Sequence, residues 1–223
     1  MDRRAGPLAS AQGVTSAQSV TSAQSVTSAQ DVTSAQSVAG VMLLGVRVTA
    51  HAVLNLAEHG RRAAAGVAAV IDPALLDRLL DLPPGVPVID SAWRAGQWPG
   101  ILERDPDGVS VTRRLESPLS ITDVVIRAAA GRELPAVQDA SLFAGFTRRW
   151  VAADRVPDAV LLEAKLCGVG ILAAGDQVVL PPAKPATLTR DGWSWLLEEK
   201  VYRRWLGERA RARAEVQPLA EPA

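Results

Sequence analysis

A short tandem repeat near the start of the chain limits where a folded domain can lie. Residues 14–37 contain four copies of the hexamer Val-Thr-Ser-Ala-Gln-Ser, with Asp31 in place of one serine. A step of six residues turns the valine by roughly 240° around a helix, so the valines form no helical stripe. In a strand each valine shares its face with serine and glutamine. We therefore expect residues 1–40 to be a disordered low-complexity leader.

The repeat leaves two alternatives open. A hexapeptide β-helix has the same period, but four copies supply little more than one coil. A near-perfect repeat in a protein also indicates a tandem repeat in the coding DNA, and Met42 lies just past it. Translation starting at or near Met42 instead of Met1 is therefore a hypothesis that the intact mass of the native protein would test.

The rest of the chain is long enough for one domain. Hydrophobic residues make up 48% of the 223 residues, which is enough to bury a core. We expect a single domain over 41–207, with a sub-boundary near 83–90 as an alternative, and a charged flexible tail over 208–223. The 24 basic and 24 acidic residues exclude a polycation but leave room for a local basic face.

Composition also bears on the compartment. The single cysteine, Cys167, excludes an internal disulfide and a Cys-rich zinc knuckle. The start of the chain does not have the pattern of a signal peptide. The most apolar window, 38–57, carries Arg47, His51 and Asn55, so it is not a membrane span. We expect a cytoplasmic protein with no membrane partner, and the oligomeric state stays open. Only three of the basic residues are lysines, which is typical of a GC-rich genome such as that of an actinobacterium.

The apolar spacing predicts an α+β domain that is mostly helical. Helices are expected at these ranges: 41–58, 72–82, 120–130, 137–153 and about 189–206. Two small β-hairpins are expected at 101–112, around Asp105-Pro-Asp-Gly108, and at 169–180. In the long C-terminal amphipathic helix, the spacing of Trp193, Leu196 and Trp205 predicts that Trp195 faces outward.

One string has catalytic chemistry. Pro157-Asp158 followed by Glu163-Ala164-Lys165 resembles the signature of the PD-(D/E)xK nucleases. The resemblance implies that Asp158 and Glu163 hold Mg²⁺ and that Lys165 supplies positive charge near the attack site. Glu and Lys two residues apart share a face only in a strand. The alternative is a helix that Asp158 caps, with Glu163 and Lys165 in solvent. Mg²⁺ belongs to the nuclease hypothesis alone, and no other cofactor or metal is expected.

A second hypothesis is architectural. Helices at 137–153 and 158–167, followed by a hairpin at 169–180, have the order of a winged-helix element. The tip of this wing would carry Asp176 and Gln177, which are not phosphate ligands. Ordinary α+β packing without nucleic acid is the alternative.

The end of the chain carries the densest positive charge. Six basic residues face one acid, Glu208, between residues 200 and 213. Cations near a helix C-terminus are also favoured by the helix dipole. We favour a non-enzymatic interaction or regulatory protein that contacts DNA or a protein partner through the hairpin region and this helix. The candidate binding residues are Lys200, Arg203, Arg204 and Arg209, which we expect to share one exposed face.

Overall fold

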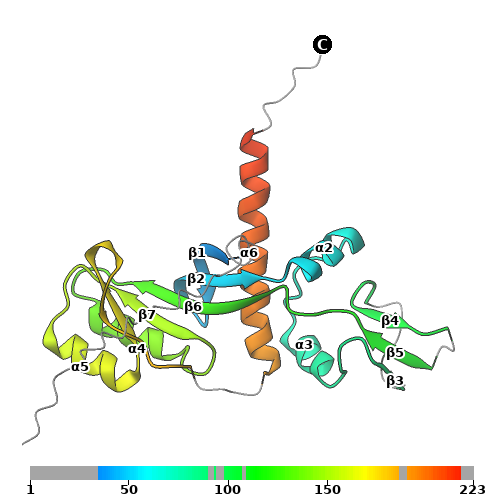
Figure 1. Cartoon of the computed structure of the whole chain (residues 1–223), viewed down its shortest axis with the longest axis horizontal. Coiled ribbons are helices and arrows are strands. Elements are labelled where there is room, and N and C mark those ends of the chain that lie inside the picture. The colour runs from blue at the N-terminus through cyan, green and yellow to red at the C-terminus, as the bar shows by residue number, and fades with distance from the viewer. Residues whose placement is uncertain (1–34, 90–92, 94–97, 107–108, 186–189, 217–223) are drawn as a thin grey trace, which may run out of the picture.

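The structure is a computed structural model, and it describes residues 35–89, 93, 98–106, 109–185 and 190–216. Figure 1 shows a larger lobe built on one sheet, a smaller lobe beside it, and a long helix between them that extends past both. Residues 1–34 of the expected leader (1–40) and the last residues, 217–223, lie outside the described residues. Residues 35–40, which were expected to be disordered, lie in a β-strand.

The larger lobe is a six-stranded mixed sheet. Its strands are β1 (Ala35–Leu43), β2 (Val46–Leu54), β6 (Leu119–Arg127), β7 (Arg148–Ala152), β8 (Gly170–Ala173) and β9 (Gln177–Leu180), side by side in that order. The pairs β6–β7 and β7–β8 are parallel, and the other neighbours are antiparallel. β1 therefore forms one edge of the sheet.

Helices cover one face of this sheet. α4 (Glu133–Ser141) connects β6 to β7, and α5 (Asp158–Cys167) connects β7 to β8. These are the crossover helices that parallel neighbours require. Residues of α4, α5 and α6 (Gly192–Val216) share one hydrophobic core with alternate residues of the strands, among them Val48, Val124 and Val151.

The smaller lobe has its own core. A three-stranded sheet of β3 (Pro87–Ile89), β5 (Ser110–Arg113) and β4 (Leu102–Arg104) accompanies α3 (Pro73–Leu80). Buried residues from Val70 to Leu115 form this second core, and Trp195 and Leu196 of α6 complete it. α6 thus contributes residues to both cores. The second core begins at Val70, earlier in the chain than the sub-boundary expected at 83–90.

The expectation of a mostly helical domain is wrong. The described residues are 38% helical and 30% strand, in a mixed α/β fold with two sheets. The largest error is at 41–58, where β1 and β2 form a hairpin in place of a helix. Val48, Ala50, Ala52 and Leu54 are buried in strict alternation. Leu44 and Gly45, both at positive φ, make the turn.

Two further expected helices are strands for much of their length. Residues 120–130 lie mostly in β6, whose β-branched run from Ile121 to Ile126 fits a pleated surface. The expected helix 137–153 ends at Ser141, and 148–152 form β7. The helical spacing of Leu142, Phe143, Phe146 and Trp150 is therefore not one face of a helix.

Several local predictions are confirmed. Asp72 caps α3 by accepting hydrogen bonds from the backbone N–H groups of Ala74 and Leu75, at 3.0 and 3.1 Å, and Pro73 is the first helical residue. β4 pairs with β5, and β8 with β9, as the two expected hairpins. The long C-terminal helix is present, and it continues through 208–216, where a flexible tail was expected. Ala, Arg and Glu, which fill that stretch, are strong helix formers.

Candidate nucleic-acid interface

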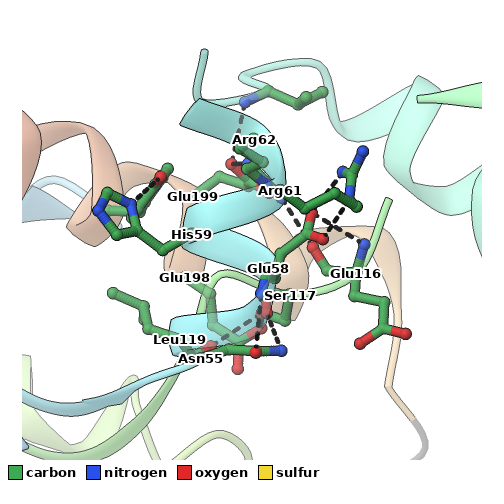
Figure 2. Close-up of polar contacts among 12 residues, drawn as sticks. Asn55, Glu58, His59, Arg61, Arg62, Glu116, Ser117, Leu119, Glu198 and Glu199 are labelled. Atoms are coloured by element: carbon green, nitrogen blue, oxygen red, sulfur yellow. Dashed lines mark hydrogen bonds and ion pairs between the residues drawn. The ribbon is translucent and has the colours of Figure 1, made fainter. Parts of the chain in front are cut away.

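α6 is fixed to the rest of the molecule by a buried polar network (Figure 2). Arg62, in α2 (Leu56–Ala65), donates hydrogen bonds to Glu199 of α6 at 2.6 and 2.9 Å and to Glu58 at 2.7 Å. Burial opposes the charge of Arg62, but the two carboxylates raise its pKa above the ordinary value. Glu199 also accepts from the backbone N–H of Val70 at 2.9 Å. These contacts fix the rotation of α6 about its axis.

The network decides which side of α6 faces solvent. Trp195 is buried, with 1% of its surface exposed, whereas Trp193 is 57% exposed. This is the reverse of the sequence prediction. Tyr202 and Trp205 are also buried, and they bond to His59 Nδ1 at 2.9 Å and to Gln36 Oε1 at 3.1 Å.

The opposite side of α6 carries a basic groove against the sheet edge. We define the basic groove by the four cations Lys200, Arg203, Arg204 and Arg211, which with Gly207 of α6 and 40–42 of β1 line a hollow of about 480 Å³. Residues three, four and seven apart lie on one face of a helix, so the four cations form a single stripe. Figure 1 shows β1 beside α6 at this point.

Gly40 lets the stripe of cations on α6 lie close to the backbone of β1. Gly40 lies at positive φ in the irregularity of β1 between Val38 and Val41. A Cβ atom built on Gly40 would lie 3.8 Å from Arg204 Nη2, so this guanidinium approaches the strand backbone closely.

Acidic residues do little to neutralise the groove. Arg204 Nε lies 2.9 Å from Glu208 Oε1. Within the described parts of the chain, Lys200, Arg203 and Arg211 form no ion pair. Arg203, Arg204 and Arg211 are exposed. The arrangement can hold several anionic groups in a row.

The structure divides the four candidate residues. It brings Lys200, Arg203 and Arg204 together, but Arg209 lies on the other side of the helix. The guanidinium carbon of Arg209 is 4.9 Å from the centre of the Trp205 ring. Arg209 and Arg213 line a different hollow, with Ala212 and Val216. Arg211 takes the fourth position in the groove, and its spacing of seven from Arg204 is the signal that would have identified it.

The winged-helix arrangement is not present. β7 stands where the second half of the first helix was expected, and β8 pairs with β7 in parallel. The hairpin of β8 and β9 is thus the last part of the six-stranded sheet and not a projecting wing. Its turn holds Asp176, at positive φ, and no basic residue.

The nuclease signature lies on a helix. Asp158, Glu163 and Lys165 are all in α5, where two residues correspond to a turn of roughly 200°. Glu163 and Lys165 therefore diverge, and Pro157, not Asp158, is the N-cap residue. The acid Asp123, in β6, accepts hydrogen bonds from Trp150 at 2.9 Å and from Arg148 at 2.7 Å. In the described chain no three His, Cys, Asp or Glu side chains gather as a metal site.

No protein-family model matches the chain, and neither a curated protein nor a solved structure matches it. Among the described residues, none of the helices combines the length and the apolar character needed to cross a membrane.

Proposed function

We propose that this protein is a DNA-binding module that grips the phosphate backbone of a duplex with the basic groove. The observation that carries the proposal is the single stripe of Lys200, Arg203, Arg204 and Arg211, to which one acid of the described chain, Glu208, is paired. Arginine side chains suit this role, because the guanidinium matches phosphate oxygens with two parallel hydrogen bonds.

The length of the stripe fits a run of phosphates. From Lys200 to Arg211 the helix rises about 16 Å. Phosphates on one DNA strand are spaced by about 3.4 Å along the duplex axis, so the stripe spans several of them. Within the described residues no strand pairs with the outer side of β1, so the groove lies at a free edge of the sheet.

The proposal implies binding without base readout. Phosphate contacts position a protein on DNA but carry no sequence information directly. We therefore expect similar affinity for different duplex sequences and a strong dependence on salt. Four neutralised phosphates correspond to a slope of log K against log salt concentration of about −3.6.

Fluorescence anisotropy with a labelled duplex tests this. The double variant Arg203→Ala/Arg211→Ala should bind more than tenfold more weakly at low salt, with a slope reduced by about 2. The matched control is Arg209→Ala/Arg213→Ala, which removes the same charge from the opposite side of the same helix. It should bind within about twofold of the unchanged chain.

Two results would reject the proposal. Equal losses in both double variants would show that the helix attracts DNA by general charge and not through the groove. No salt-dependent binding by the unchanged chain would exclude DNA as the ligand and leave an acidic protein partner as the alternative for the same groove.

A further inference from the structure

A cavity of about 380 Å³ lies where the two cores meet, away from the basic groove. Its polar lining is Asn55, Arg113, Glu116, Ser117, Ser120 and Arg190, and the indole of Trp195 forms part of its wall. These residues come from the larger sheet, the smaller lobe and the start of α6. No part of the proposed DNA interface belongs to this cavity.

Arg113 is a buried cation without a carboxylate partner. Only 9% of its surface is exposed, and no ion pair in the described chain involves it. Its Nη1 donates to the backbone oxygen of Leu79 at 2.7 Å, but its Nε has no hydrogen-bond partner among the described residues. Burial lowers the pKa of Arg113 and the charge of Arg190 lowers it further, while the charge of Glu116 acts in the opposite direction. A buried positive charge is unfavourable unless a carboxylate or hydrogen-bond acceptors compensate it.

A second buried donor lines the same cavity. Trp195 Nε1 also has no hydrogen-bond partner in the described part of the chain. The guanidinium carbons of Arg113 and Arg190 lie 5.4 and 4.9 Å from the centre of the Trp195 ring. Buried polar atoms are almost always satisfied in proteins, so unsatisfied donors on two residues that line one cavity favour a bound acceptor near them.

Two acids, Glu116 and Glu198, lie near the cavity. Glu116 is exposed at the lining. Glu198 bonds to Arg190 and to the Ser117 hydroxyl at the margin. Arg113 has neither acid as an ion-pair partner.

We propose that this cavity binds a small molecule through its phosphate group. Two guanidinium groups that approach the cavity from different elements suit a dianion better than a singly charged carboxylate, and a phosphate offers more acceptor oxygens. The Ser120 side chain, which is exposed at the lining, offers a further hydroxyl donor. The cavity volume is in the range of small-ligand sites.

The probe is inorganic phosphate, which is titrated into the protein at constant ionic strength, with chloride as the reference anion. Acetate is titrated in a second series. Calorimetry and the phosphorus-31 line width of phosphate should both report binding to the unchanged protein. Arg190→Gln, at the exposed rim, should weaken phosphate binding at least tenfold. Arg114→Gln is the matched control, because Arg114 directly follows Arg113 in the chain but pairs with Glu103, which is not part of the cavity lining.

The outcomes separate the alternatives. Phosphate binding that Arg190→Gln weakens and Arg114→Gln leaves unchanged would support the site. No binding beyond chloride, equal binding of acetate, or equal behaviour of the two variants would overturn it. The groove variant Arg203→Ala/Arg211→Ala should keep its phosphate affinity, and Arg190→Gln should keep its DNA affinity, so either proposal can fail alone. Arg113→Gln offers a second test provided that its circular dichroism matches that of the unchanged chain.

Discussion

Arg62 and Glu199 form an ion pair in which neither side chain has any exposed surface, with Nη2 2.6 Å from Oε1. Removing Glu199 leaves the buried charge of Arg62 with less compensation, since Glu58 is then the carboxylate that still pairs with it. Glu199→Gln should therefore lower the free energy of unfolding by about 3–5 kcal/mol, measured by urea denaturation. Arg61→Ala is the control, since Arg61 pairs with Glu58 at 31% exposure and should matter by less than about 1 kcal/mol. Similar losses in both variants would contradict the structural role of the buried pair.

The stability of the protein should depend on pH through Glu198. Burial, the largest influence, raises the pKa of its carboxyl to about 7, although Arg190 and Ser117 act to lower it. The folded chain then binds this proton more tightly than the unfolded chain, whose pKa is near 4.5. Stability is therefore expected to fall as pH rises from about 4.5 to about 7, by up to about 3 kcal/mol.

The variant Glu198→Gln isolates this effect. Its stability should lack the fall between these pH values, and the two chains should differ more at pH 8 than at pH 4.5. His59 makes stability rise with pH, because burial and, as a smaller influence, the charge of Arg209 lower its pKa. This contribution is present in both the unchanged chain and Glu198→Gln. Parallel stability curves for the two chains would show that Glu198 titrates normally.

Gly170 should not accept a side chain. A Cβ atom at this position would lie 2.4 Å from Cε3 of Trp150, on the neighbouring strand. Gly170→Ala is expected to lower the free energy of unfolding by about 1–3 kcal/mol, because the ring and strand must shift. Gly60→Ala, in α2 with open space around the position, should instead raise stability by up to about 1 kcal/mol. Thermal unfolding of both variants tests the contrast, and a neutral Gly170→Ala would show that Trp150 moves freely.

A chain that starts at Met42 should be much less stable than one that starts at Ala35. The shorter chain loses Val38 and Val41, both buried, and the hydrogen bond from Trp205 to Gln36. Burying two valines contributes about 3 kcal/mol or more. Chemical denaturation of the two chains provides the comparison, and equal midpoints would show that β1 is dispensable for the fold.

The sequence predicted those elements whose signals are local. Asp72-Pro73 has the chemistry of a helix start by itself, and Asp105-Pro-Asp-Gly108 has that of a tight turn, so α3 and the β4–β5 hairpin were predicted correctly. The apolar residues between 41 and 56 fit both a helical and an alternating pattern. Only pairing with β6, which lies some seventy residues further along the chain, selects the strand, with Thr49 opposite Val125.

The candidate site could be predicted only in part, because only part of its signal is local in the sequence. The positive charge at 200–213 is visible in the sequence, but which cations share a face depends on how α6 is rotated. That rotation is set by Arg62, which is distant in sequence and buried against Glu199. The cavity with Arg113 and Arg190 has no local signal at all, because its two cations lie 77 residues apart in sequence. Only folding brings them to one indole ring.

β1 begins at Ala35, inside the last hexamer copy, which covers residues 32–37. Because the unit has an even number of residues, gaining or losing a whole copy upstream keeps the same side chains on the same face of this strand. A whole copy also keeps the reading frame of its coding DNA. A change by one whole copy in the coding DNA therefore delivers the same residues, in the same order, to this edge strand.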